Sequence, residues 1–181
     1  MQKSAISKMP EYFDRYINLT DDLSFTEVLQ ISLEELENLP VAQWKALGEE
    51  IYAPGKWTAK DILQHMIDTE RVFSYRMTAF SRGDSQKMLA FDEDLYANNA
   101  DANRRTIEDL LAELILVRKN YIALYASFSP EMLLKSGQGF NGSEYSVLAM
   151  AFMIPGHQRW HFNIVKERYF PLLAELKNQS S

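Results

Sequence analysis

Long runs of apolar residues spaced three and four positions apart most constrain the fold of this chain. In one such run the apolar positions are Ile107, Leu110, Leu111, Leu114, Val117, Tyr121, Leu124 and Phe128. This spacing places all of them on one face of a helix. The 181 residues include only seven glycines and six prolines, too few for the frequent turns of an all-β protein. The sequence therefore predicts an all-α fold.

Four long helices are predicted, over residues 25–39, 58–82, 104–128 and 143–169. Thr58 is a good N-cap for the second helix, with Asp61 three positions later as in a capping box, and Gly83 ends that helix. Ser143 is the N-cap expected for the fourth helix. Pro40 ends the first.

Shorter features are expected between the long helices. A short helical piece should follow Pro40, a second should begin at Pro130, and the glycines of 137–142 should form a loop. Residues 84–103 are polar and turn-prone without a sustained period, which predicts a long crossover between the second and third helices. A crossover of this length is able to span a bundle diagonally. Its acidic stretch, 92–94, lacks the EF-hand pattern and is expected to be solvated.

Composition narrows the class of protein. With 46% hydrophobic residues, the chain is expected to form one domain over 1–181, with a core of about 12–170. The net charge of -6 opposes the phosphate-neutralising surface that nucleic-acid binding needs. The absence of cysteine excludes disulfides and thiolate zinc sites. Neither a secretion signal nor a membrane span is recognisable, so a cytoplasmic protein is expected.

The three histidines of the chain are candidate metal ligands. His157 and His161 are one helical turn apart and so share a face, while His65 lies near the apolar stripe of the second helix. If those two helices are neighbours, three neutral nitrogens bind one ion and leave coordination positions open. Zinc, nickel and ferrous iron are all compatible with imidazole ligands. The alternative is that the histidines are hydrogen-bonded core residues.

Several other residues receive structural predictions. Pro155 removes the backbone bond to the carbonyl of Ala151, so a kink or local unwinding is expected just before His157. Arg76 lies about three turns from His65 and is expected to form an ion pair at the end of the bundle. Four aromatic residues are expected to pack in the interior with a polar tip, namely Trp57, Tyr75, Tyr121 and Tyr125.

Five short motifs carry a family resemblance. They are YAPGKWT at 52–58, HMIDTE at 65–70, RGD at 82–84, FDED at 91–94 and PGHQRWH at 155–161. In order and spacing the chain resembles the DinB/YfiT-like superfamily from about residue 12 to residue 170. The resemblance implies a four-helix bundle with a long link between helices two and three, often as a homodimer. It also implies a divalent metal held by His65, His157 and His161.

Two positions depart from that family pattern. Relatives often have Glu and His where this chain has Gln158 and Trp160. A carboxylate partner is therefore absent there, and a general base would have to be Asp68, Glu70 or a metal-bound hydroxide.

The resemblance implies several activities. One hypothesis is a metal-dependent hydrolase, or a transferase of a low-molecular-weight thiol, acting on a small electrophilic substrate. The alternatives are a metal-binding stress protein without turnover and a dimeric interaction module in which the histidines only pack. The sequence assigns no catalytic residue.

Overall fold

A computed structural model describes residues 1–139 and 142–174 of the chain. Its elements in order are η1 (Lys3–Ala5), α1 (Asp14–Ile17), α2 (Phe25–Glu37), α3 (Val41–Ala46), α4 (Ala59–Ser81), α5 (Glu93–Ala100), η2 (Ala102–Arg104), α6 (Ile107–Ala126), α7 (Pro130–Leu134), β1 (Ser136–Gln138), β2 (Glu144–Ser146), α8 (Val147–Ile164) and the π-helical turn η3 (Val165–Tyr169). The predicted all-α class is confirmed, with one small antiparallel hairpin added.

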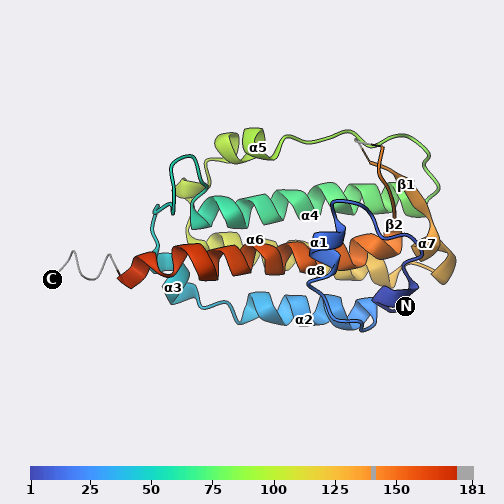
Figure 1. The fold of residues 1–181 in the computed structure, drawn as a ribbon, viewed down its shortest axis with the longest axis horizontal. Helices are drawn as coiled ribbons and strands as arrows, with labels where there is room; N and C mark the ends of the chain where they lie inside the picture. Colours follow the sequence, from blue (N-terminus) through green and yellow to red (C-terminus); the bar gives the residue numbers. More distant parts are fainter. Residues whose placement is uncertain (140–141, 175–181) are drawn as a thin grey trace.

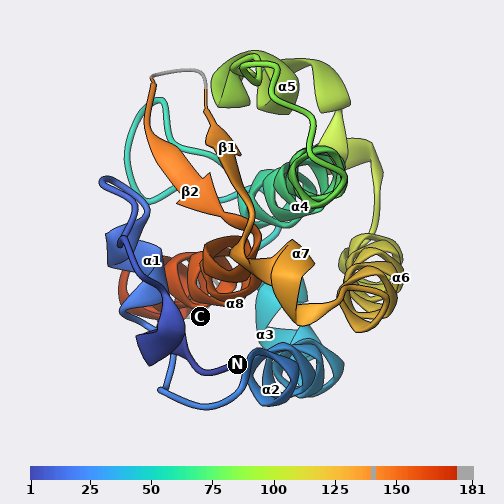
Figure 2. The same ribbon diagram turned by 90° about the vertical axis from the view of Figure 1, so that its right-hand side faces the viewer.

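Helices α2, α4, α6 and α8 lie side by side as a four-helix bundle (Figures 1 and 2). Helix α4 contacts α6 and α8, and α2 contacts the same two helices, so α2 and α4 occupy opposite corners. Figure 1 shows α4 and α6 running in one direction while α2 and α8 run in the other. The crossover therefore returns along the whole bundle to join two parallel neighbours. The crossover does not take the diagonal path that its length would allow, since the diagonal connections are α2 to α4 and α6 to α8.

Helix starts follow local capping chemistry. The side chain of Thr58 accepts a hydrogen bond from the backbone N–H of Asp61, and the Asp61 carboxylate accepts one from the backbone N–H of Thr58, as predicted. Helix α6 begins at Ile107, after the N-cap Thr106, three residues later than expected. Helix α8 begins after Ser146 instead of Ser143, because residues 144–146 first pair with β1. The predicted loop over 137–142 is thus partly a hairpin, and residues 140 and 141 lie outside the described part.

Two predictions about shape are corrected. The crossover contains a helix, α5, whose N-cap Asp92 accepts a hydrogen bond from the backbone N–H of Leu95. Helix α8 continues through Pro155 without the expected local unwinding. Gly156 has a clear reason to be glycine, because a Cβ there would lie 1.9 Å from the backbone oxygen of Tyr16. Its absence of a side chain lets α1 pack directly on α8.

The interior consists of two apolar clusters with a polar layer between them. One cluster includes Phe73 and Ile154, and the other includes Met66 and Val165. Each long helix contributes one buried polar or charged residue to the layer between them. These residues are Ser32 of α2, Glu70 of α4, Arg118 of α6 and Gln158 of α8. His157 and His161 lie on α8 between residues of the two clusters. In the part of the chain that the structure describes, no helix is sufficiently long and apolar to cross a membrane.

Candidate metal centre

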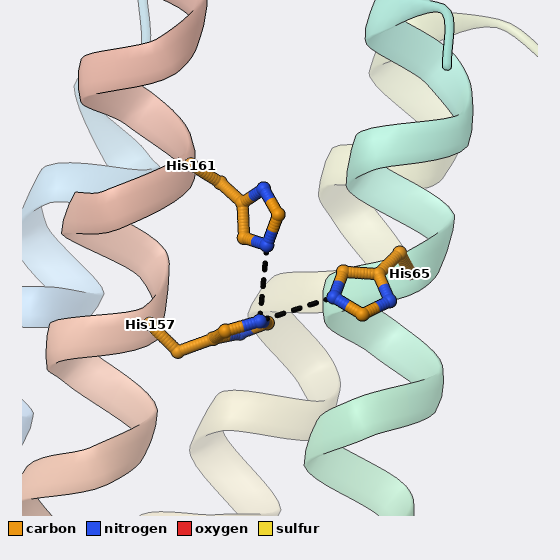
Figure 3. A group of neighbouring side chains, drawn as sticks. All are labelled: His65, His157 and His161. Carbon is orange, nitrogen blue, oxygen red and sulfur yellow. Dashed lines mark hydrogen bonds between the residues drawn. The ribbon is translucent and has the colours of Figure 1, made fainter. Parts of the chain in front are cut away.

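The structure brings all three candidate histidines together. His65 projects from α4 toward His157 and His161, which project from successive turns of α8 (Figure 3). The Nε2 atom of His157 lies 3.0 Å from Nε2 of His65 and 3.0 Å from Nε2 of His161. The side chains are buried, with exposed fractions of 4–9%. Three nitrogens from two helices thus converge on one point.

Burial keeps these imidazoles neutral. It lowers the pKa of His65 to about 3, and the neighbouring His161 adds to that effect. It also lowers the pKa of His161 to about 4 and that of His157 well below its usual value. A neutral imidazole has a lone pair available, which is the form that binds a metal.

The donor set fits a transition metal better than it fits a packed core. Nε2 of His157 faces two other Nε2 atoms, but it carries either one proton or one lone pair, so it forms at most one good hydrogen bond. A single cation satisfies all three lone pairs at once. Tetrahedral zinc with Zn–N bonds of about 2.0–2.1 Å separates its ligand nitrogens by about 3.3 Å, close to the observed spacing. In addition, Nδ1 of His161 is buried with no partner among the described residues.

Aromatic rings hold the histidines in place. The Trp57 ring centroid lies 4.7 Å from that of His65 and 6.4 Å from that of His161, nearly parallel to the latter. Tyr16 meets His157 edge to face at 5.1 Å. Trp57 is partly buried against the core, and the partners of its ring are site residues, which no local sequence signal indicated.

A cavity of about 310 Å³ opens beside His161. Its lining includes Trp57, Lys56 and Asp94 in addition to that histidine. This volume is at the lower limit for small-molecule sites, and the mixture of aromatic and charged side chains is typical of them. The histidine cluster is therefore accessible from a space of ligand size.

Neither carboxylate suggested from the sequence faces the histidines as a free base. Both Glu70 carboxylate oxygens accept hydrogen bonds from Arg118, at 2.7 and 3.2 Å, in a fully buried pair. Arg118 also donates to the hydroxyl of Ser32. Asp68 lines a separate, open cavity with Tyr96, and no histidine lines that cavity. Glu70 is therefore not free to act as a base, because Arg118 holds its carboxylate. The sequence did not predict this pair, since Arg118 stands among apolar residues of α6.

Gln158 has structural partners on α2. Its amide donates to the backbone oxygen of Ser32 and to the carboxylate of Glu35, at 3.0 and 2.8 Å. It therefore ties α8 to α2 directly beside His157.

Two further predictions were wrong. Tyr75 is 65% exposed, because it lies about 200° around α4 from the buried Phe73. Arg76 has no carboxylate partner within the described residues. It is buried over the Phe73 ring, 5.0 Å from its centroid, and donates to the backbone oxygen of Leu89. Tyr121 and Tyr125 are buried as predicted and donate to the backbone oxygens of Met150 and Val147.

Comparison with known proteins identifies the family. A family model described as the DinB superfamily matches residues 24–165. This chain belongs to the DinB superfamily. Among solved structures, this DinB-superfamily protein is similar to YfiT from Bacillus subtilis, with a TM-score of 0.59 and 16% identity over 97% of this chain and 90% of that one. That protein is described as a probable metal-dependent hydrolase with an unusual four-helix bundle topology. No curated protein sequence matches the chain.

Proposed function

We propose that this protein is a metal-dependent hydrolase of a small electrophilic substrate, with His65, His157 and His161 as the ligands of one divalent transition metal. The observation that carries the proposal is the convergence of three buried, neutral Nε2 atoms beside a cavity of about 310 Å³. Membership of the DinB superfamily and the description of YfiT support the same class of reaction. Zinc, nickel and ferrous iron are the candidate metals.

Different residues would hold the metal, orient its ligands and contact the substrate in such a reaction. When bound, the metal would supply Lewis-acid chemistry, polarising an oxygen or activating water. The three imidazoles hold it, and Trp57 keeps two of them in a fixed orientation. Lys56 and Asp94 offer opposite charges to polar groups of a substrate in the cavity. The buried Arg118–Glu70 pair and Gln158 hold the helices around the ligands.

Metal content and turnover test this function. Elemental analysis of untagged protein is expected to find about one ion per chain, and His65→Ala and His161→Ala should each reduce it strongly. Gln64→Ala is the matched control, since Gln64 is adjacent to His65 but bonds to Asp68 and Arg105 instead. The loaded protein should hydrolyse members of a panel of activated esters and amides. A wild type without stoichiometric metal contradicts the proposal, and a loaded but inert one favours a non-catalytic metal-binding protein.

Transfer of a low-molecular-weight thiol is the second candidate. Lys56 and Asp94 favour it, because such thiols commonly carry both carboxylate and amine groups. Turnover of electrophilic acceptors that requires added thiol, with no hydrolysis in its absence, would replace the hydrolase proposal by this one.

We also propose that the protein is a homodimer, as the family resemblance implies. Exposed apolar side chains on α4 and α6, among them Tyr75 and Leu116 at 65% and 68%, are consistent with a contact surface. Light scattering should then give about twice the chain mass of 21.0 kDa. The cytoplasmic location expected from the sequence stays a prediction.

A further inference from the structure

Two cavities border the histidine cluster, and they differ greatly in size. The cavity beside His157, which Thr69 and Glu93 also line, has a volume of about 20 Å³ and accommodates one water molecule. The cavity beside His161 has a volume of about 310 Å³, which is at the lower limit for sites that bind organic molecules. A substrate of the proposed hydrolase therefore fits beside His161 and not beside His157.

Aromatic and aliphatic side chains form most of the wall of the larger cavity. They are Tyr52, Trp57, Ile62, Ile164 and Tyr169. The rings of Tyr52 and Tyr169 meet edge to face, with their centroids 5.1 Å apart. The Tyr169 hydroxyl donates to the backbone oxygen of Trp57, so its proton is not available to a ligand. These walls favour an apolar group in the substrate.

Two opposite charges belong to the lining of the same cavity. Lys56 comes from the loop before α4, where Gly55 adopts a φ of 74° and the Lys56 backbone N–H donates to the backbone oxygen of Ala53 at 3.2 Å. Asp94 comes from the first turn of α5. Both side chains are exposed, and neither has an ion-pair or hydrogen-bond partner within the described residues. A ligand with one ammonium and one carboxylate group would pair with both charges.

The size of the cavity limits the distance between the two charged groups of such a ligand. A sphere of about 310 Å³ is about 8 Å across, and two extended residues span about 7 Å. A dipeptide has an ammonium group at one end, a carboxylate at the other and one amide bond between them. It also carries side chains that are able to contact the aromatic walls. The cavity therefore matches a dipeptide in length and charge better than it matches an uncharged ester.

Resting on the proposed hydrolase function, we propose that the substrate is a zwitterionic amide of dipeptide size and that Asp94 and Lys56 determine this specificity. Asp94 accepts hydrogen bonds from the ammonium group, and Lys56 donates to the carboxylate. An apolar side chain of the substrate lies against Tyr52 and Trp57, and its amide bond lies beside His161. Hydrolysis consumes one water molecule, whose oxygen bonds to the amide carbon as the C–N bond breaks. One water proton goes to the released amine and the other stays with the new carboxyl group, so the products are two amino acids.

Calorimetric titration tests the binding site without turnover. The probe is the ketomethylene analogue of alanylphenylalanine, in which a CH₂ group replaces the amide nitrogen and prevents hydrolysis. Its N-acetyl derivative lacks the ammonium group, and its C-terminal amide lacks the carboxylate. Asp94→Asn should weaken binding of the zwitterionic probe about three- to tenfold and leave binding of the N-acetyl derivative unchanged. Lys56→Gln should weaken binding of the zwitterionic probe by a similar factor and leave binding of the C-terminal amide unchanged.

Two substitutions on the surface control for net charge. Lys87→Gln and Asp101→Asn change the charge as Lys56→Gln and Asp94→Asn do, at exposed residues that do not line the cavity. Each should leave the affinities for all three probes unchanged. Equal affinities of the wild type for the three probes, or losses in the controls as large as those in the cavity variants, would overturn the site.

Turnover separates this inference from the function on which it rests. Protein loaded with metal should convert alanylphenylalanine into alanine and phenylalanine, with a higher kcat/KM than for its N-acetyl derivative or its C-terminal amide. Hydrolysis of activated esters and amides without any preference for the zwitterion overturns the inference alone. Selective binding of the zwitterionic probe by a loaded protein that hydrolyses no ester or amide overturns the proposed function, while the charge-selective site stands.

Discussion

The three histidines show how burial sets the chemistry of a single residue. Solvation favours the charged imidazolium, so its loss inside the bundle lowers the pKa of each ring. Because the neutral rings keep a lone pair, they are able to bind a metal. Without a metal, the same burial makes the folded protein less stable in acid, where the histidines are driven to take up protons. Gln158 is buried as a neutral amide, and its Nε2 atom donates two hydrogen bonds to residues of α2.

Metal-free protein should lose stability below about pH 6.5. Because the folded pKa values of His65 and His161, about 3 and 4, lie below the unfolded value of 6.5, folding favours the neutral forms. Their contribution is complete above pH 6.5 and decreases as the pH falls toward 4, by about 1.4 kcal/mol per pH unit for each histidine. Urea unfolding at several pH values in the presence of a chelator measures this. His161→Gln should have a shallower dependence, and an unchanged slope would contradict the interpretation.

At the scale of helices, Arg118 joins three of the four bundle members. It extends from α6 to Glu70 on α4 and to Ser32 on α2. All three side chains are buried. If either charged group lost its partner, no solvent would be present to take the partner's place. Such a pair specifies which helices are adjacent more than it adds to stability.

Glu70→Gln should destabilise the protein by about 3–5 kcal/mol, because it leaves the Arg118 guanidinium buried without a counter-charge. Chemical denaturation of wild type and variant gives the difference in unfolding free energy. Glu108→Gln is the matched control, since Glu108 pairs with Lys45 at 2.6 Å on the surface, where solvent replaces the lost partner, and its effect should be much smaller. Equal effects of the two substitutions would show that the buried pair is not special.

Gly156→Ala tests the close packing of α1 on α8. The new methyl group would overlap the backbone of Tyr16, so α1 must move, at a cost of about 1–3 kcal/mol. Because the Tyr16 ring rests against His157, metal affinity should fall as well. Thermal unfolding and metal titration measure both effects. Gly48→Ala, where no atom lies within 4 Å of the added carbon, should leave metal affinity unchanged; a loss of affinity there would remove the link to α1.

For the whole molecule, the topology places His157 and His161 between the two apolar clusters on α8, with His65 facing them from α4. Helices α4 and α8, which carry them, run in opposite directions at adjacent corners of the bundle (Figure 1). A metal at that point therefore joins elements distant in sequence, and its binding energy adds to the stability of the folded chain.

Metal addition should accordingly raise the melting temperature. Free zinc at a hundred times its dissociation constant contributes about 2.7 kcal/mol, which for a chain of this length corresponds to about 5–11 °C. Differential scanning fluorimetry with and without a chelator measures the shift. His157→Gln should show none, and a shift of equal size in that variant would place the metal elsewhere.

Local patterns were sufficient for much of the fold. The capping box at Thr58, the apolar spacing of α6 and the separation of His157 and His161 are each decided by residues within a few positions of one another. For that reason these features followed from the sequence. Helix α5 and the hairpin were missed because short elements depend on packing against a neighbour, here α4 for α5 and β1 for β2.

The sequence by itself determined the four long helices, the capping box at Thr58 and the identity of three candidate ligands. Only the tertiary structure decided that α4 and α8 are neighbours, that Arg118 pairs with Glu70, and that Glu93 and Asp94 of α5 each line a cavity beside a histidine. The physical reason is one of range. Backbone hydrogen bonds and caps act between residues close in the chain, whereas charge pairing, burial and metal convergence depend on which helices lie side by side.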